Sequence, residues 1–327
     1  MTDPTVRPPL TERIAAAPIS WGVCEVIGWG WQHQPQTVLT QMRELGIAAT
    51  EFGPDGFLPD DPQAKADTLA QYGLAAVGQF VPVVLHDPSI DPLPTVETAM
   101  AGLVAARATT VVIAAATGAE GYDARPELDE GGWATLLANL DWISDAAAAQ
   151  GLTATLHPHV GTMVESGEET DRVLAGSRIG LCLDTGHLLI GGGDPVRVAR
   201  EHPERIAHMH LKDVDLAWAR KVQEGSATYT EAVAAGMYVA LGRGDVDVAA
   251  IVDSLEGAGY AGWYVLEQDT ILAGDPAEAA TPKGGGDPVA DVRASVGYLT
   301  SVATTLRGAH AERGTHSQSS SHLRERE

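Results

Sequence analysis

The chain has 327 residues, of which 44% are hydrophobic, 5% aromatic and 20% charged, a composition typical of globular proteins and unlike that of disordered, collagen-like or disulfide-stapled chains. Its 44 acidic residues outnumber the 21 Lys and Arg and give a formal net charge of −23, which repels phosphate backbones and argues against a nucleic-acid partner. Cys24 and Cys182 lie far apart without CxxC spacing, so the sequence predicts neither a disulfide framework nor a cysteine zinc site.

The two ends of the chain are polar. The N-terminus lacks the apolar core of a signal peptide, and no stretch reaches the roughly 18 apolar residues of a membrane helix, so we expect a cytoplasmic protein with no membrane partner. Residues 308–327 are polar and of low complexity, without a hydrophobic period. We therefore expect one folded domain over residues 1–307 and a disordered C-terminal tail over 308–327.

Between these ends, short β-rich runs alternate with longer alanine-rich segments of helical period. The candidate strands cover residues 13–20, 47–53, 75–85, 109–115, 152–158, 178–186, 205–213 and 262–269. The candidate helices cover residues 35–46, 62–73, 94–108, 133–151, 166–175, 194–202, 246–258 and 286–306. Parallel strands that each precede a helix, in this number and in a chain of this length, predict an α/β fold, a single (β/α)8 TIM barrel.

A doubly wound sheet is the alternative fold, but no GxGxxG motif follows an early strand. The segment from about Val214 to Leu241 is long for a connection between a strand and a helix. We expect it to carry a helix of its own over the mouth of the barrel.

Polar side chains follow five of the candidate strands, at the ends where a TIM barrel carries its active site. Polar groups left unpaired in an apolar barrel would cost several kcal/mol each, so their convergence at one rim implies a shared partner, most economically a divalent metal ion. In chain order they are Glu51; His157 and His159; Asp184 and His187; His210, Lys212 and Asp213; and Glu267 and Asp269.

Asp184, His210 and Glu267, with His157 as a fourth candidate, combine carboxylate and imidazole without thiolate. Such a set suits Mn²⁺, Co²⁺, Mg²⁺ or Zn²⁺ as a Lewis acid. For each residue alone, the alternative is a capping or salt-bridging group at a strand end. His208 shares a strand face with His210, so we expect one of the two to pack inside the barrel or to support the other.

The first candidate strand is followed by Trp21, Trp29 and Trp31. Aromatic faces bind the CH surface of polyols, but packing under a loop or at a subunit interface would also keep these rings from water. His86, after the third strand, is equally open to a ligand contact or a loop position.

Blocks of sequence between about residues 10 and 300 carry a family resemblance. They are PISWGVCEVIGWGWQ, TEFGPDGFLP, HPHVGTMVES, LCLDTGHLLIGGGDP, RIAHMHLKDVD, YVALGRGDVD and GYAGWYVLEQD. Together they resemble the sugar phosphate isomerase and epimerase-like superfamily of TIM barrels. That superfamily also holds ketose epimerases, hydroxypyruvate isomerase, dehydroshikimate dehydratase and a base-excision endonuclease. The tryptophan-rich start and the HPHVGT block narrow the resemblance to the inosose dehydratases.

The superfamily resemblance implies a metal held by a glutamate after strand five, an aspartate after strand six, a histidine after strand seven and a glutamate after strand eight. The last three match Asp184, His210 and Glu267. Where the first glutamate would stand the chain has His157, with His159 two residues on. The exchange removes a negative charge and a candidate base, which argues against a simple two-glutamate epimerase mechanism.

The resemblance implies a metal-dependent hydro-lyase of inositol catabolism, which dehydrates 2-keto-myo-inositol (scyllo-inosose) through α-proton removal and an enolate. Mn²⁺ or Co²⁺ is the expected metal, with Mg²⁺ or Zn²⁺ as alternatives. The candidate bases are Glu267 and His157, and the candidate acids are Lys212 and His187. The candidate substrate contacts are Trp21, Glu51, His86 and His159.

Three other functions remain open on the sequence. An isomerase or epimerase would use the same enediolate and return the proton. A nuclease is disfavoured by the charge of −23 and by the lack of the further histidines of a multinuclear zinc site. A non-catalytic sugar-binding barrel would bind ligand without a metal requirement. The large barrel and the tryptophan-rich loop also favour a homodimer.

Overall fold

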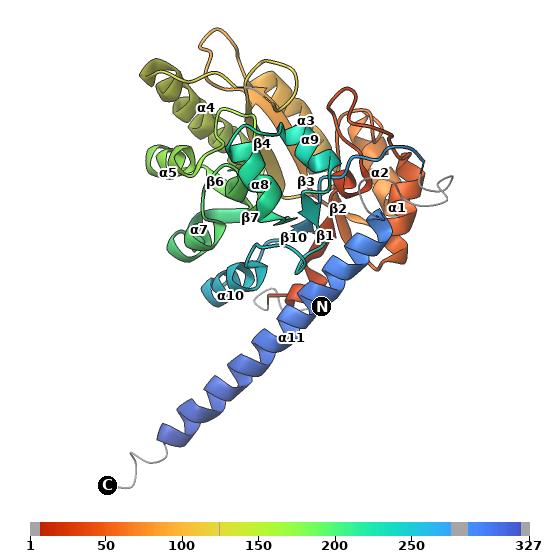
Figure 1. Ribbon diagram of the computed structural model, residues 1–327, viewed down its shortest axis with the longest axis vertical. Coiled ribbons are helices and arrows are strands. Elements are labelled where there is room, and N and C mark those ends of the chain that lie inside the picture. Colours follow the sequence, from red (N-terminus) through yellow and green to blue (C-terminus); the bar gives the residue numbers. More distant parts are fainter. Residues whose placement is uncertain (1–6, 124, 276–286, 322–327) are drawn as a thin grey trace.

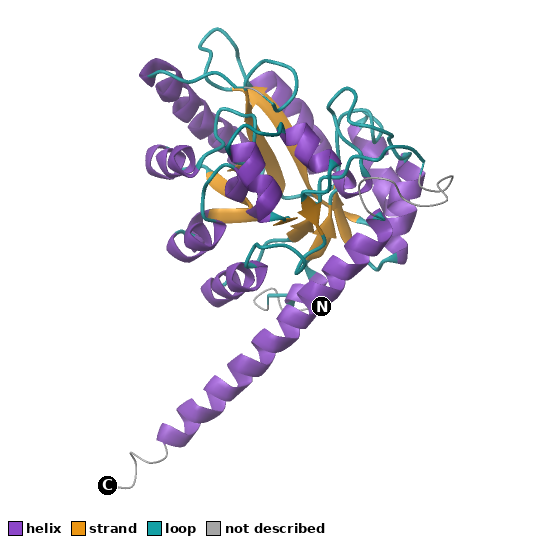
Figure 2. Cartoon of the chain, in the orientation of Figure 1, coloured by secondary structure: helices purple, strands orange, loops and turns teal. Residues whose placement is uncertain are grey.

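A closed barrel of parallel strands forms the centre of the molecule (Figures 1 and 2). It is seen in a computed structural model, which describes residues 7–123, 125–275 and 287–321. The eight strands follow the order β1-β10-β7-β6-β5-β4-β3-β2 around the barrel, and each predicted strand overlaps one of them, which confirms the predicted TIM barrel. Their bounds are β1 Ile14–Ala16, β2 Ala49–Glu51, β3 Ala75–Val84, β4 Thr110–Ala116, β5 Thr153–Leu156, β6 Gly180–Asp184, β7 Ile206–Leu211 and β10 Tyr264–Leu266.

Helices surround the barrel, and several begin at the residues that the sequence pattern favours (Figure 2). Asp61, Asp129 and Asp194 cap helix N-termini with their side chains, and Ser166 forms a capping box with Glu169. The helices are α1 Pro35–Glu44, α2 Pro62–Gln71, α3 Leu93–Ala105, α4 Glu130–Ala149, α5 Gly167–Gly176, α6 Thr185–Ile190, α7 Pro195–Glu201, α10 Val248–Ala258 and α11 Pro288–Ser321. The short helix α6 follows β6 directly and was not predicted.

The long segment after β7 does carry its own secondary structure, as predicted. It holds α8 (Leu216–Gln223) and α9 (Tyr229–Ala234), and its ends pair as a two-stranded antiparallel sheet of β8 (Asp213–Val214) and β9 (Tyr238–Val239). Tyr229, at the start of α9, lines the cavity at the barrel mouth. The insertion therefore contributes directly to the wall of the candidate site.

The interior of the barrel is apolar near the N-terminal ends of the strands and polar near their C-terminal ends. Ala15, Ala49, Val77 and Val265 form a small buried cluster between the strands. Because side chains alternate along a strand, the inward positions two residues further on include Glu51 and Glu267. A Cβ added to Gly78 would lie 3.3 Å from Glu51 Oε1 and 3.6 Å from His208 Nε2, so glycine there leaves room for this buried pair.

Helix α11 begins against the barrel and then leaves it (Figure 1). Val292, Leu299 and Val302 are buried, and the helix continues past Gly308 as far as Ser321. Residues 308–321 were expected to lack regular structure, but extending an existing helix needs no new nucleation, so their polar sequence can follow the packed part. Residues 322–327 lie outside the described residues, and the domain boundary at 307 stays a prediction.

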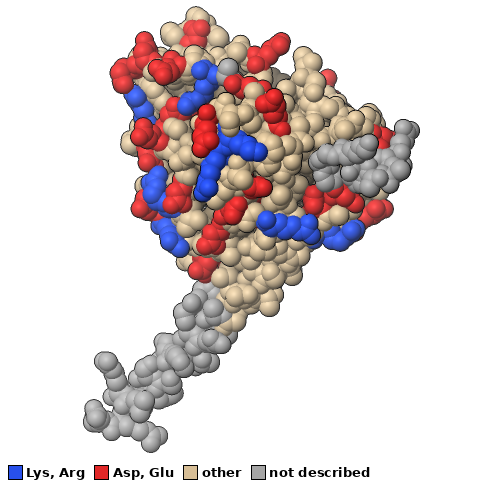
Figure 3. Space-filling view, in the orientation of Figure 1, with Lys and Arg blue, Asp and Glu red and all other residues tan. Residues whose placement is uncertain are grey.

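The surface carries both signs of charge. Acidic and basic side chains are interspersed over the face drawn in Figure 3, so the excess of negative charge forms no single block on that face. Among the described residues, no helix combines the length and hydrophobicity needed to cross a membrane.

At the N-terminal end of the strands, Arg13 ties β1 to the α10–β10 connection. Its side chain is 4% exposed, donates to the carbonyls of Tyr260 (3.1 Å) and Gly262 (2.8 Å) and pairs with Glu256 at 2.5 Å. Arg13→Ala would leave that carboxylate without its buried partner, so we expect it to lower the free energy of unfolding by about 3–5 kcal/mol in urea titrations.

Arg7 is the matched control, because it contacts the same carboxylate at 3.2 Å but its side chain is 34% exposed. We expect Arg7→Ala to cost less than about 1 kcal/mol. Equal losses in the two variants would show that burial does not set the strength of this contact.

Candidate active site

One donor atom each from His157, Asp184, His210 and Glu267 lies within 4.8 Å of the others, and all four residues are buried. They come from four strands that are neighbours in the barrel, since β10, β7, β6 and β5 follow one another. Asp184 ends β6, His210 lies near the end of β7, and His157 and Glu267 directly follow β5 and β10. The fold thus brings together the four residues predicted as metal ligands, while their role as ligands stays a prediction.

The orientation of these groups fits a divalent cation. His157 Nδ1 lies 2.9 Å from the carbonyl of Pro158, which can only accept a hydrogen, so in the neutral ring Nε2 points its lone pair at Asp184 Oδ2, 3.6 Å away. His210 Nε2 lies 2.9 Å from Glu51 Oε1, and its Nδ1 faces Glu267 Oε2 at 2.6 Å without hydrogen-bond geometry. Histidines that bind metals hold the far ring nitrogen in this way.

One carboxylate oxygen of Asp184 contacts helix α6, and the other faces the candidate metal site. Oδ1 accepts from the backbone N–H of Gly186 (2.9 Å) and His187 (2.8 Å) at the start of α6. Oδ2 faces His157, His210 and Lys212. Burial alone would raise the pKa of Asp184, but the neighbouring positive charges, Lys212 first, hold that pKa well below its ordinary value.

Lys212 lies among carboxylates although its side chain is 1% exposed. Its Nζ is 2.9 Å from Asp184, 2.5 Å from Glu267 and 3.1 Å from Asp269. Burial lowers the pKa of Lys212, but these three carboxylates raise it by more, so the pKa lies well above its ordinary value. A region that holds an ammonium so firmly is strongly negative, which is the environment a divalent cation requires.

Glu51 lies behind His210 and joins it to His208. Its Oε1 accepts from His208 Nε2 at 2.8 Å and from His210 Nε2 at 2.9 Å. Burial alone would raise the pKa of Glu51, but the charge of His210 and the bonds from both rings bring that pKa below its ordinary value. Glu51 borders the cavity, as a substrate contact would, but its bonds orient histidines. His208 is the supporting histidine that the alternation along β7 predicted.

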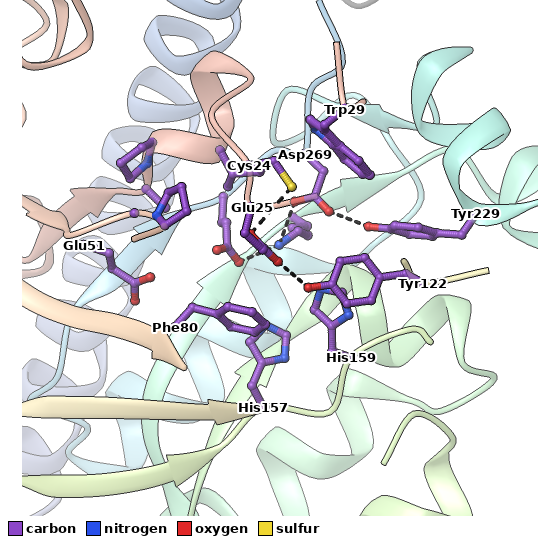
Figure 4. A pocket seen from close by; sticks show the side chains of 17 residues that line it. Cys24, Glu25, Trp29, Glu51, Phe80, Tyr122, His157, His159, Tyr229 and Asp269 are labelled. Carbon is purple, nitrogen blue, oxygen red and sulfur yellow. Dashed lines mark hydrogen bonds and ion pairs between the residues drawn. The ribbon is translucent and has the colours of Figure 1, made fainter. Parts of the chain in front are cut away.

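A cavity of about 60 Å³ opens next to these groups at the barrel mouth (Figure 4). Five of the predicted site residues line it: Glu51, His157, His159, Lys212 and Glu267. Much of the remaining wall is aromatic and consists of Trp29, Phe80, Tyr122 and Tyr229. Cys24, Glu25 and Asp269 also line the cavity. A polar floor with aromatic walls suits a ligand that has hydroxyl groups and an apolar CH face.

Asp269 and Tyr229 connect the insertion to this floor. The Tyr229 hydroxyl donates to Asp269 Oδ2, and the other oxygen of Asp269 contacts Lys212. Burial raises the pKa of Asp269 to about 6; the charge of Lys212 opposes this increase and that of Glu267 adds to it.

His187 lies behind the cavity wall instead of in it. Its ring stacks on His159 with centroids 3.6 Å apart, and its Nε2 is 3.6 Å from Asp269. Burial and the charge of His159 lower the pKa of His187 well below its ordinary value, so the ring is neutral near pH 7. Position and charge both disfavour the predicted role of His187 as a proton donor.

Two predicted substrate contacts lie elsewhere. Trp21 is fully buried in the main core, where its indole N–H donates to Gln41 on α1 at 2.8 Å. Trp29, eight residues later, lines the cavity in its place, and its indole N–H donates to the carbonyl of Thr270. His86 is not among the residues that line the described cavities. The loop after β1 therefore reaches the cavity through Trp29, while Trp21 packs in the core, and a substrate contact from this loop stays a prediction.

Several wall residues had no assigned role in the sequence analysis: Cys24, Glu25, Phe80, Tyr122, Tyr229 and Asp269. Asp269 had a usable signal, because it follows β10 two residues after Glu267. Tyr122 and Tyr229 come from the loop after β4 and from the inserted helix α9, whose paths the sequence did not specify.

The sequence profile described as the xylose isomerase-like TIM barrel matches residues 39–286. The chain belongs to this family. Within the curated relatives, the rhizopine catabolism protein MocC of Rhizobium meliloti is 32% identical over 89% of this chain and 91% of its own length. An inosose dehydratase of Geobacillus kaustophilus is 31% identical over 82% of this chain and 89% of its own. The inosose dehydratase resemblance read from the sequence blocks is thereby confirmed.

Solved structures of other proteins share the fold at low identity. An L-ribulose 3-epimerase matches 91% of this chain and 97% of its own with a TM-score of 0.66 and 16% identity. The IolI protein, solved with a zinc atom, matches 90% of this chain and 99% of its own with a TM-score of 0.64 and 12% identity. Family and relatives together identify a sugar-processing TIM-barrel enzyme.

Glu51→Gln provides a test of how the histidines are held. Glutamine keeps the size but loses the charge that accepts both N–H groups, so we expect the affinity for Mn²⁺ to fall about 10- to 100-fold in isothermal titration calorimetry. Glu44→Gln, an exposed exchange of the same kind at the end of α1, is the control. Unchanged affinity in the Glu51 variant would mean that its bonds do not support the cation site.

Proposed function

We propose that this chain is a metal-dependent hydro-lyase that removes water from 2-keto-myo-inositol. The observation that carries the proposal is the convergence of His157, Asp184, His210 and Glu267 beside a cavity with aromatic walls. The inosose dehydratases among the curated relatives supply the substrate class.

The four converging residues would hold the ion, and Mn²⁺ or Co²⁺ is our proposed metal for this mixed nitrogen and oxygen set. Mg²⁺ and Zn²⁺ are the alternatives, and zinc is the metal in the solved IolI structure. When bound, such an ion acts as a Lewis acid that stabilises negative charge developing on a ketone oxygen.

The protein's own groups then have to move two protons. Glu267 borders the cavity and would accept the proton from the carbon next to the ketone. Lys212 borders it too, is held protonated by its carboxylates, and would donate a proton to the departing β-hydroxyl group. The C–H and C–O bonds break, one water leaves, and the enol product tautomerises to a diketone.

His157 was a second candidate base, but its Nε2 lone pair faces the ligand cluster, which favours a role as ligand. Of the two candidate acids, Lys212 lines the cavity and His187 does not. The aromatic side chains around the cavity would cover the ring of the substrate and limit access of bulk water to the enolate.

The direct test is the purified enzyme assayed with scyllo-inosose. We expect the ultraviolet absorption of a dione to appear, EDTA treatment to abolish it, and Mn²⁺ or Co²⁺ to restore it. Asp184→Asn should lose both metal and activity, whereas Asp145→Asn, an exposed exchange on α4, should keep both.

Two results would contradict the proposal. Full activity in protein shown by elemental analysis to be metal-free would reject the cation site. Interconversion of ketoses without formation of a dione would replace the dehydratase by an isomerase or epimerase that uses the same enediolate.

His157 allows a test at the position where the chain departs from the superfamily pattern. We expect His157→Gln to weaken metal binding, and His157→Glu to keep the metal but slow dehydration, because the added negative charge opposes the enolate. Metal content and kcat are measured for both variants. If both variants keep the metal of the wild type and differ mainly in KM, His157 contacts the substrate and is not a ligand.

A further inference from the structure

The cavity at the barrel mouth is too small for a six-membered ring. Its volume is about 60 Å³, whereas a cavity that holds benzene has roughly 150 Å³. A cyclic polyol is larger than benzene, so binding it next to His157 and Glu267 requires one of the wall side chains to move.

Tyr122 is the wall residue that the inner cavity shares with both of its outer neighbours. It lines the inner cavity and also two outer cavities of about 500 Å³ and 410 Å³, so its side chain separates all three. The larger outer cavity further shares Glu25 and Trp29 with the inner one, and the smaller shares Tyr229. Rotation of the Tyr122 ring would join the inner cavity to an outer one.

Hydrogen bonds and ion pairs hold Lys212, Trp29 and Tyr229 more firmly than Tyr122. Lys212 is fixed by three carboxylates, and the buried Trp29 and Tyr229 donate to Thr270 and Asp269. The hydroxyl of Tyr122 donates to the carboxylate of Glu25, which is itself exposed (Figure 4). Breaking this bond exposes both partners to water, so it costs far less than opening the buried floor.

The backbone beneath Tyr122 is held in place while its ring projects into the wall. Asp123 accepts from the backbone N–H and the hydroxyl of Thr230 at 3.1 Å each, which ties the loop to α9. Gly161, with φ of +76°, lets the loop approach, since a Cβ there would lie 2.3 Å from the carbonyl oxygen of Tyr122. The loop is fixed on both sides, so the motion available is a change of side-chain rotamer.

We propose that Tyr122, latched to Glu25, is the gate of this site and determines the size of ligand that it accepts. With the latch closed, the ring of Tyr122 lies against His159, with centroids 4.4 Å apart, and the inner cavity holds only small molecules. With the latch open, a ring enters, and the Tyr122 ring can close over it. The proposal depends on the proposed function only for the ring-shaped ligand.

The native thiol of Cys24 allows opening of the gate to be measured without an assay of enzyme activity. Cys24 lines the inner cavity, and Cys182, the other cysteine of the chain, is fully buried in β6. The rate of modification of Cys24 is measured by peptide mass spectrometry with a small reagent, methyl methanethiosulfonate, and a bulky one, 5,5′-dithiobis(2-nitrobenzoate). Tyr122→Phe removes the latch and keeps the ring, and Tyr122→Ala removes both. Tyr72→Phe, at the end of α2, is the control.

Loss of a hydrogen bond to a charged group should favour the open form by about tenfold. We therefore expect Tyr122→Phe to accelerate the bulky reagent about three- to tenfold more than the small one, and Tyr122→Ala to accelerate it further, with no change for Tyr72→Phe. Equal acceleration of both reagents would reveal an altered thiol pKa and overturn the gate, as would unchanged rates.

The labelling rates test the gate independently of the proposed dehydratase function. An enzyme that fails to dehydrate inosose but shows the size-dependent labelling keeps the gate and loses the proposed substrate. An enzyme that dehydrates inosose without size-dependent labelling keeps the function and loses the gate.

Discussion

The site depends on the balance of charge inside the barrel. Asp184, Glu267 and Asp269 all contact Lys212, so three carboxyl groups surround one ammonium where little water reaches them. Charges buried in a low-dielectric interior are stable only when paired, and one lysine cannot pair with three acids. Burial raises the pKa of Asp269 to about 6, the charge of Lys212 opposes this increase, and the neighbouring charge of Glu267 adds to it. A bound divalent cation would remove the excess of negative charge and would replace a proton on His210 Nδ1, which faces Glu267.

The fold can hold this charge because each ligand is fixed from behind. The helix α6 binds one oxygen of Asp184, Glu51 accepts from the far nitrogen of His210, and the carbonyl of Pro158 holds His157. The supports of Asp184 and His157 are local in sequence, whereas Glu51 lies 159 positions from His210, so this third support forms only when the barrel has closed. The small side chains below leave the interior free for the Glu51 and His208 pair. Asp184, His210 and His157 are thus held firmly, whereas at the rim a single hydrogen bond joins the side chains of Tyr122 and Glu25.

The residues at the ends of strands could be predicted from the sequence, whereas the positions of residues in loops could not. Asp184, His210 and Glu267 could be found because each stands at the end of an apolar run, and in a parallel barrel those ends converge. Trp21 and Trp29 could not be told apart, since the choice between core and cavity depends on the turn at Gly22 and on contacts with residues some 240 positions away. Tyr122 meets Glu25 across a gap of 97 residues. The helical course of residues 308–321 depended on the packed start of α11 and not on their own composition.

His157 gives the clearest link between sequence and proposed chemistry. With a glutamate at this position the ligand set would carry three negative charges, more than a divalent ion neutralises. With histidine the set carries the charges of Asp184 and Glu267, which match the ion, while Lys212 remains paired with Asp269 at 3.1 Å. A site without excess negative charge stabilises an enolate better, and it keeps Lys212 available to protonate a leaving hydroxyl group. Expulsion of hydroxide needs such a proton donor, whereas epimerisation needs a second base. In the proposed function, the exchange of glutamate for histidine would therefore favour elimination of water over return of the proton.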